Sequence, residues 1–360
     1  MEARTRIYAA VAFAMALFLG VQLGGLALVQ PLEAADKAFT QNPEDPTNSV
    51  VYVVAILVAT GLMLLAFKYD FDWVVRGFVI VASASLAWQV FDVLVPAPFS
   101  LALAALVGIG LVAYPEWYVI DIAGVLMGGA AAGLFGISFG LLPTILLLVV
   151  LAVYDAISVY GTEHMLDLAD GVMDMKVPVI LVIPTTLSFS FLDMAPAETA
   201  SDDDDATVED EDAAVAADGE TVADGDGEAL ADGDGGADVE LDYAEGDDSD
   251  AEADGVVQRD AFFVGLGDAV MPTILVASAA HFHTAVPGGT VPDLGLPLVT
   301  MNLPALGAIV GTQLGLVVLL WMVLKGRAHA GLPLLNGGAI AGYLVCAVAS
   351  GLSLTAALGL

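Results

Sequence analysis

The hydrophobic positions of the chain fall into long runs separated by short polar segments. A helix needs about 20 apolar residues to cross the hydrocarbon core of a bilayer, with a range of roughly 17–25. We therefore expect an all-α membrane protein built as a bundle of nine transmembrane helices. Runs of suitable length predict spans over residues 5–29, 49–67, 73–94, 98–113, 117–135, 140–160, 260–283, 301–324 and 332–356.

Composition supports a membrane protein and excludes a soluble enzyme. Hydrophobic residues make up 58% of the chain and its mean hydropathy is +0.83, whereas soluble domains are roughly 45–50% apolar. The single cysteine, Cys346, rules out an intrachain disulfide and a cysteine-cluster metal site.

The net charge of −35 is concentrated in one insert between the sixth and seventh spans. Residues 198–254 hold 25 Asp and Glu and no Lys or Arg. We expect an acidic, disordered cytoplasmic loop over residues 195–258, because such a sequence cannot bury enough apolar area to offset its ordering entropy. Adaptation to high salt, which screens surface self-repulsion, and an acidic partner-binding segment are both compatible with this composition.

The insert divides the chain into further parts. Residues 1–160 hold spans one to six, and residues 259–360 hold the last three. Between span six and the acidic loop, residues 161–194 are predicted to be amphipathic or interfacial. Within them, residues 177–192 are apolar but contain two prolines, so we expect a segment docked on the bundle instead of a tenth span.

Basic residues predict the orientation in the membrane, because Lys and Arg accumulate in cytoplasmic loops. With nine spans, eight of the nine basic residues fall on one side and only Lys37 falls on the other. The N-terminus and the insert are then cytoplasmic and the C-terminus lies outside. The eight residues are Arg4, Arg6, Lys68, Arg76, Lys176, Arg259, Lys325 and Arg327.

Two acids stand inside apolar runs on either side of the insert. Asp155 lies near the cytoplasmic end of span six, and Asp268 lies eight residues into span seven from the same side. Charged groups inside a membrane are expensive and usually functional. Two neighbouring carboxyls titrate in coupled steps, so one can take a proton from water while the other polarises a peptide carbonyl. Alternatively, each acid satisfies a separate backbone or ion-pair contact.

Other polar residues in the spans are expected to serve structure. Asp92 and Asp121 lie near span ends, so we expect them to be solvated or to assist packing. Four amides are expected to make interhelical hydrogen bonds, namely Gln22, Gln89, Gln313 and Asn336.

Three motifs around the acids resemble a known family. They are Tyr154-Asp155, Gly265-Leu266-Gly267-Asp268 and Leu332-Pro333-Leu334-Leu335-Asn336. In this order and at these spans they are similar to the YD, GxGD and PAL motifs of the presenilin and signal peptide peptidase family of intramembrane aspartyl proteases. The nine-span layout with its insert also resembles that family, most closely a haloarchaeal member. Leu334 departs from the alanine of the PAL motif, which puts the fit of the substrate in doubt.

The resemblance implies that Asp155 and Asp268 are a catalytic dyad needing no metal or organic cofactor. It implies active-site support from Tyr154, Gly265, Leu266, Gly267, Pro333, Leu334 and Leu335. The glycines lack Cβ atoms and permit close approach of a substrate or a helix. Pro333 is expected to delay its helix and to fix an extended segment at the cleft. The substrates would be single-span membrane proteins or signal peptides in the lipid bilayer.

Two other classes of function remain open at this stage. A proton- or cation-coupled secondary transporter uses similar membrane acids, but it predicts a repeat between the two halves of the chain, and none is visible. A catalytically silent scaffold would carry a relict dyad. His281 and His283 lack a third metal ligand in register, and no pattern indicates nucleic-acid binding or a nucleotide cofactor.

Overall fold

The computed structural model describes residues 3–69, 71–161, 180–186, 189–190, 261–282, 291, 293–296, 299–325 and 330–360. The acidic stretch 195–258 lies outside the described residues, as does most of the predicted interfacial segment.

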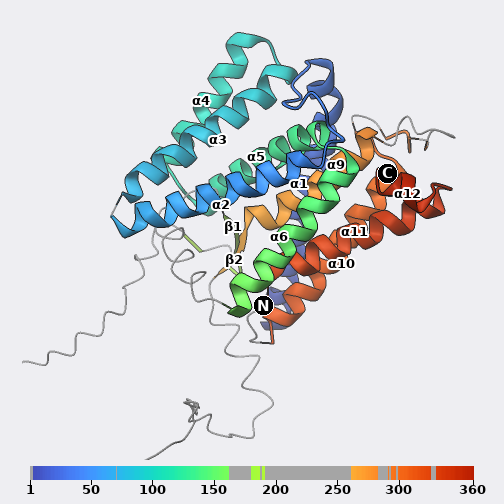
Figure 1. Ribbon diagram of the computed structural model, residues 1–360. Coiled ribbons are helices and arrows are strands. Elements are labelled where there is room, and N and C mark those ends of the chain that lie inside the picture. The colour runs from blue at the N-terminus through green and yellow to red at the C-terminus, as the bar shows by residue number, and fades with distance from the viewer. Residues whose placement is uncertain are drawn as a thin grey trace, which may run out of the picture. The chain divides into compact units, whose positions relative to one another are not determined.

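Helices in the described residues correspond to all nine predicted spans and confirm the helical membrane fold (Figure 1). Seven are long and apolar enough to cross a membrane, and two apolar helices of 17 residues, α4 and α9, are shorter. The helices are α1 (Ala3–Ala34), α2 (Thr47–Lys68), α3 (Asp72–Leu94), α4 (Ala97–Ala113), α5 (Trp117–Ser138), α6 (Leu141–Gly161), α9 (Leu266–Phe282), α10 (Leu303–Val323) and α11 (Gly331–Ala349), followed by the short α12 (Leu354–Ala357).

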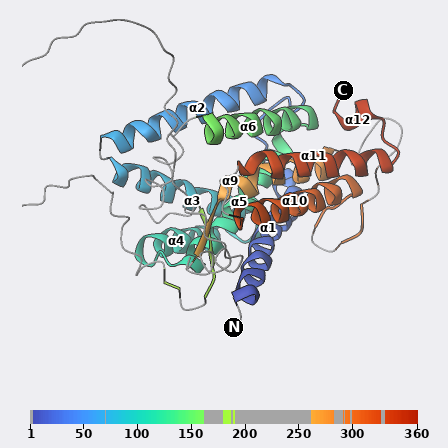
Figure 2. The same cartoon turned by 90° about the horizontal axis from the view of Figure 1, so that it is seen from below.

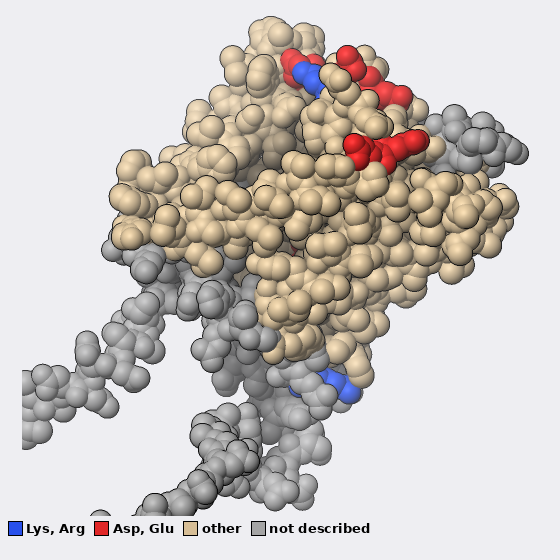
Figure 3. All heavy atoms as spheres, in the orientation of Figure 1, with Lys and Arg blue, Asp and Glu red and all other residues tan. Residues whose placement is uncertain are grey.

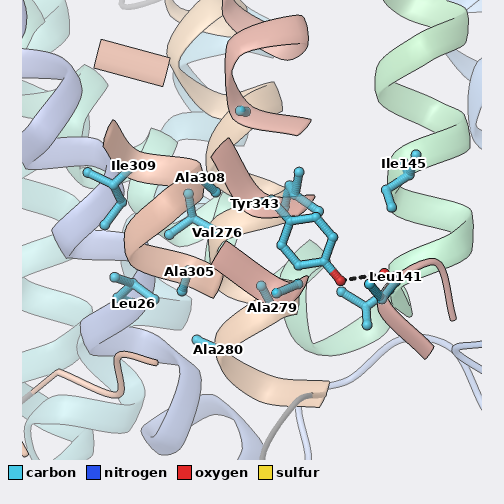
Figure 4. Close-up of a cluster of buried hydrophobic side chains, with 14 of the residues drawn as sticks. Leu26, Leu141, Ile145, Val276, Ala279, Ala280, Ala305, Ala308, Ile309 and Tyr343 are labelled. Carbon is cyan, nitrogen blue, oxygen red and sulfur yellow. Dashed lines mark hydrogen bonds between the residues drawn. The ribbon is translucent and has the colours of Figure 1, made fainter. Parts of the chain in front are cut away.

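The helix α9 forms the centre of the bundle. It packs against α1, α5, α6, α10 and α11, and every residue from Pro272 to Ala280 is buried. Figure 4 shows Val276, Ala279 and Ala280 of α9 among side chains of α1, α10 and α11. A helix that is apolar on all sides lies either in a protein core or in lipid, and the burial of α9 shows that its neighbours enclose it.

The helices α2, α3 and α4 lie at the periphery, and α10 and α11 lie on the opposite side of α5 and α9 (Figures 1 and 2). The outer faces of α2, α3 and α4 expose large apolar side chains, among them Leu62, Phe78 and Leu106. On the face shown in Figure 3, a broad band without charged side chains separates a mixed group of acidic and basic residues at one end from basic residues at the other. Such a band is the surface that a bilayer requires.

The pair α10 and α11 is in direct backbone contact. A Cβ on Gly311 would overlap the carbonyl oxygen of Gly338, and a Cβ on Gly307 would overlap that of Gly342. Small residues let membrane helices approach this closely, and dispersion contacts between their backbones then hold them together. This packing fixes α11 against the rest of the bundle.

Three of the four amide side chains predicted to make interhelical hydrogen bonds do so, namely Gln22, Gln313 and Asn336. The Nε2 atom of Gln313 donates to Oε1 of Gln22 over 3.1 Å and joins α10 to α1. The Nδ2 atom of Asn336 donates to the Leu148 carbonyl over 3.0 Å and joins α11 to α6. Asp92 forms a half-exposed ion pair with Lys37, as its position near a span end suggested.

One feature absent from the sequence analysis is a two-stranded antiparallel sheet beside α9. Strand β1 (Ile180–Pro184) pairs with β2 (Ala261–Gly265), with Val182 opposite Phe263 and Ile180 opposite Gly265. The predicted span over 260–283 was therefore wrong at its start, because its first residues form a strand and the helix begins at Leu266. The strand β1 also shows how part of the predicted docked segment packs, since four of its five residues are buried.

Candidate active site

The carboxyl of Asp155 lies in the last third of α6 and faces the start of α11. Asp155 is 8% exposed. The backbone amide of Leu332 donates to Oδ2 of Asp155 over 2.9 Å, and the amide of Gly331 also faces this carboxyl. The first amides of a helix have no partner within the helix and carry the positive end of its dipole. The start of α11 can therefore stabilise the negative charge of an ionised Asp155.

Asp268 lies at the start of α9 and not deep within it. From the apolar run, this acid was expected eight residues into a span, but it is the third residue of α9 because β2 precedes it. A Cβ placed on Gly331 would lie 3.2 Å from Oδ2 of Asp268. The carboxyls of Asp155 and Asp268 are also near enough to interact electrostatically.

Gly331 and Leu332 connect the two acids. The amides of this pair face Asp155, while the Cα of Gly331 lies against the carboxyl of Asp268. The structure thus brings Asp155 and Asp268, which are 113 positions apart in the sequence, to neighbouring residues at the start of α11. Two carboxyls around one point can hold and activate a single water molecule.

Pro333 does not delay its helix, which corrects the sequence-based expectation. The helix α11 begins at Gly331, two residues earlier, and extended backbone occurs at Ala330 with φ −64° and ψ 123°. Proline is compatible with the first helical turn, because the N–H that it lacks has no helical acceptor there. The amide of Ala330 interacts with the Tyr160 hydroxyl over 3.4 Å, so α6 holds this end of α11 at a second point.

The two glycines of the GxGD motif have different surroundings. A Cβ on Gly265 would lie 3.6 Å from Oδ2 of Asp268, an ordinary contact distance. A Cβ on Gly267 would meet nothing within 4 Å, and this residue is exposed. Packing between helices therefore does not explain Gly267 among the described residues.

The remaining predicted site residues divide between the core and the surface. Leu266 and Leu335 are buried in one apolar cluster, with Leu334 packed against it. Tyr154 is 40% exposed and is not part of that cluster. Pro272 lies four residues after Asp268 in α9, so it lacks the N–H that the Asp268 carbonyl oxygen would accept in a regular helix.

Asp121 is buried, so of the two expected roles, solvation or packing, the structure excludes solvation and agrees with packing. It is 2% exposed, and its Oδ1 accepts a hydrogen bond from the Val182 amide of β1 over 2.7 Å. Nearby, Glu116 caps the start of α5 and accepts a hydrogen bond from the Ser190 hydroxyl over 2.6 Å. Asp121 thus binds Val182, and Glu116 binds Ser190.

Sequence reasoning missed Gly331, the sheet and the role of Asp121. Gly331 stands immediately before the Leu-Pro motif, and a glycine beside a motif residue is a signal of close backbone approach. The sequence Ile180-Leu181-Val182-Ile183 is rich in β-branched residues and ends at a proline, a pattern that favours a strand. No local pattern connects Asp121 to Val182.

The histidines give no metal site in the described part of the chain. His281 contacts Glu33 over 3.4 Å between Nδ1 and Oε2, and His283 lies outside the described residues. Among the residues that the structure describes, no group of three or more His, Cys, Asp or Glu side chains could hold a metal ion.

Comparisons with known proteins agree on one family. The model of the family described as "Signal-peptide peptidase, presenilin aspartyl protease" matches residues 15–352. A solved structure described as "a presenilin family intramembrane aspartate protease in C222 space group" is similar over 94% of this chain and 99% of its own, with 29% identity and a TM-score of 0.56. The same kind of protein in space group P2 is similar over 93% and 96%, with 28% identity and a TM-score of 0.53. The comparison with curated proteins found no match, and none of these findings supports a secondary transporter.

Proposed function

Because the chain belongs to the presenilin and signal-peptide peptidase family of intramembrane aspartyl proteases, we propose that Asp155 and Asp268 are its catalytic pair. The observation that carries this proposal is the arrangement at the start of α11. The Leu332 amide donates to Asp155, and the neighbouring Gly331 lies so close to Asp268 that an added Cβ would be 3.2 Å from its Oδ2, although the two acids come from helices on opposite sides of the insert.

The arrangement suggests how the two acids divide their work. Asp155 is the base, because backbone amides of α11 face its carboxylate. Asp268 holds the shared proton. Asp155 takes a proton from water as the water oxygen attacks the scissile carbonyl carbon, and Asp268 gives its proton to the carbonyl oxygen. The resulting diol collapses when Asp155 protonates the amide nitrogen, the C–N bond breaks, and Asp268 recovers its proton from the diol.

The substrates in this proposal are single-span membrane proteins or remnant signal peptides, cut near their cytoplasmic ends. Both acids lie at the end of the bundle where α6 ends and α9 and α11 begin. A peptide bond inside a helix is shielded from attack, so the substrate must unwind locally. Gly267 is exposed and an added Cβ would meet nothing within 4 Å in the described chain, so an unwound backbone could pass beside this residue, next to Asp268.

The test uses purified full-length protein in liposomes with an internally quenched fluorescent peptide that contains one apolar helix of about 20 residues. The unaltered protein should cleave the peptide, and Asp155→Asn and Asp268→Asn should each lower the rate by about a thousandfold or more. Asp92→Asn is the matched control, since that acid pairs with Lys37 away from the site, and it should retain most of the activity. Cleavage that survives both active-site substitutions would refute the assignment, and ion flux without cleavage would favour transport.

A further inference from the structure

We propose that Asp121 is a positioning residue of the protease, which holds the β1–β2 sheet on α5 and thereby sets the position of Asp268. The inference rests on the proposed role of Asp268. It concerns a third membrane acid that lies outside the catalytic pair.

The first step is the contact between Asp121 and β1. The Val182 amide donates to Oδ1 over 2.7 Å in a buried environment. The other oxygen, Oδ2, is buried and has no hydrogen-bond partner among the described residues. Burying a carboxyl in a membrane helix is expensive and needs a compensating function. Within the described chain, holding Val182 is the function that this side chain performs.

The second step is the direction of that amide. In an antiparallel pair, the N–H and C=O of one residue point to the same side of the strand. Val182 is paired in register with Phe263 and gives its N–H to α5, so this N–H points away from β2. Asp121 therefore binds the outer edge of β1 without competing for the ladder between β1 and β2.

The third step leads along α5 to the catalytic helix. A Cβ on Gly124 would lie 3.1 Å from Cδ2 of Leu181, and a Cβ on Gly128 would lie 3.1 Å from Cδ1 of Leu266. Asp121, Gly124 and Gly128 are three and four residues apart and thus share one face of the helix. On this face of α5, Asp121 binds β1 through a hydrogen bond. Leu266, the first residue of α9, packs against Gly128, where a side chain would leave no room.

The final step is the short connection from the sheet to the acid. The strand β2 ends at Gly265 and Asp268 follows three residues later, in the first turn of α9. If β1 shifted on α5, β2 would move with it because the two strands are hydrogen-bonded, and the first turn of α9 with Asp268 would be displaced. Misplacing a catalytic group by about 1 Å lowers rates by roughly a hundredfold, so the loss of the Asp121 contact should appear in kcat.

The experiment compares Asp121→Leu with Asp121→Asn in the full-length protein, using the liposome assay and the quenched peptide described above. Leucine removes the acceptor, and we expect kcat to fall at least tenfold with KM changed less than about threefold. Asparagine keeps an acceptor oxygen, and kcat should stay within about threefold of the unaltered protein. The melting temperature of both variants should fall by no more than about 5 °C.

A second substitution tests the same bond from the strand. Val182→Pro replaces the donor N–H by a ring carbon that also displaces the Asp121 carboxyl, while the ladder to β2 keeps its bonds because this N–H points away from β2. It should also lower kcat at least tenfold, and it remains informative if Asp121→Leu does not fold. In the double variant Asp121→Leu/Val182→Pro the loss should equal that of one single variant, since both remove one interaction.

Several results would overturn the inference. These are an active Asp121→Leu variant, an Asp121→Asn variant as impaired as Asp121→Leu, a rise in KM alone, or losses that multiply in the double variant. If Asp155→Asn is inactive while Asp121→Leu is fully active, this inference fails and the catalytic assignment stands. If Asp155→Asn and Asp268→Asn are both active, the catalytic assignment itself fails.

Discussion

At the scale of single residues, the site depends on how closely backbone can approach a carboxyl. Gly331 is the tightest case, because an added Cβ would lie 3.2 Å from Oδ2 of Asp268 and 3.5 Å from Cδ2 of Leu319. We expect Gly331→Ala to move that carboxyl by a few tenths of an ångström and to lower kcat by about tenfold. Stability should not fall, because alanine favours a helix more than glycine does. Parallel cleavage assays and melting curves check this, and a fully active variant would contradict it.

Gly267 allows the two explanations of the GxGD glycines to be separated. An added Cβ meets nothing within 4 Å in the described chain, so Gly267→Ala should leave the melting temperature unchanged or slightly raised. If an unwound substrate passes over this residue, the same variant should lose at least tenfold in kcat/KM. Gly265→Ala, with a Cβ at 3.6 Å from Asp268, is the comparison variant. Normal cleavage by Gly267→Ala would show that the substrate does not pass here.

At the scale of elements, the contact between α10 and α11 fixes the helix that carries Gly331. Gly338 packs on the backbone of Gly311, so an added Cβ would overlap its carbonyl oxygen, whereas Gly337, the next residue in the same helix, has open space around it. Gly338→Ala should destabilise the fold by about 1–3 kcal/mol through forced separation of the helices. Gly337→Ala should be neutral or stabilise it by about 0.5–1 kcal/mol. Thermal unfolding in one detergent compares the pair, and equal melting temperatures would contradict the packing argument.

The elements also show what the sequence could predict. The nine spans followed from the length of apolar runs, because a bilayer imposes a fixed minimum on helix length. The strand β2 was merged with α9 because five apolar residues before a helix have no period that distinguishes them from helix. The backbone around Pro333 was wrongly expected to be extended, because proline is compatible with both an extended segment and a first helical turn.

The limits of prediction at the site have a similar cause. The two acids could be chosen because an ionisable group in an apolar run is conspicuous. Asp121 was equally conspicuous, but its partner amide lies 61 residues away on a strand that had not been predicted. A contact between a side chain and a distant backbone group cannot be predicted without the tertiary structure. The position of Gly331 beside both carboxyls could not be predicted for the same reason.

At the scale of the whole molecule, the helices define two ends whose sides of the membrane can be assigned by experiment. The Ser49 hydroxyl donates to the Pro143 carbonyl, so α2 and α6 start at one end and both run toward the other. The end of α2, near Tyr69, therefore lies at the same end as the proposed catalytic acids. The distribution of Lys and Arg predicts that this end is cytoplasmic.

Cysteine labelling measures this orientation directly. In a Cys346→Ser background, Gln41→Cys lies in the link between α1 and α2, and Tyr69→Cys follows α2; both positions are exposed. A membrane-impermeant maleimide should label Gln41→Cys in intact cells and Tyr69→Cys only after the membrane is opened. Activity of each variant should be normal, since neither residue touches the site. The reverse labelling pattern would place the acids near the outer surface, and substrates would then be cut near their outer ends.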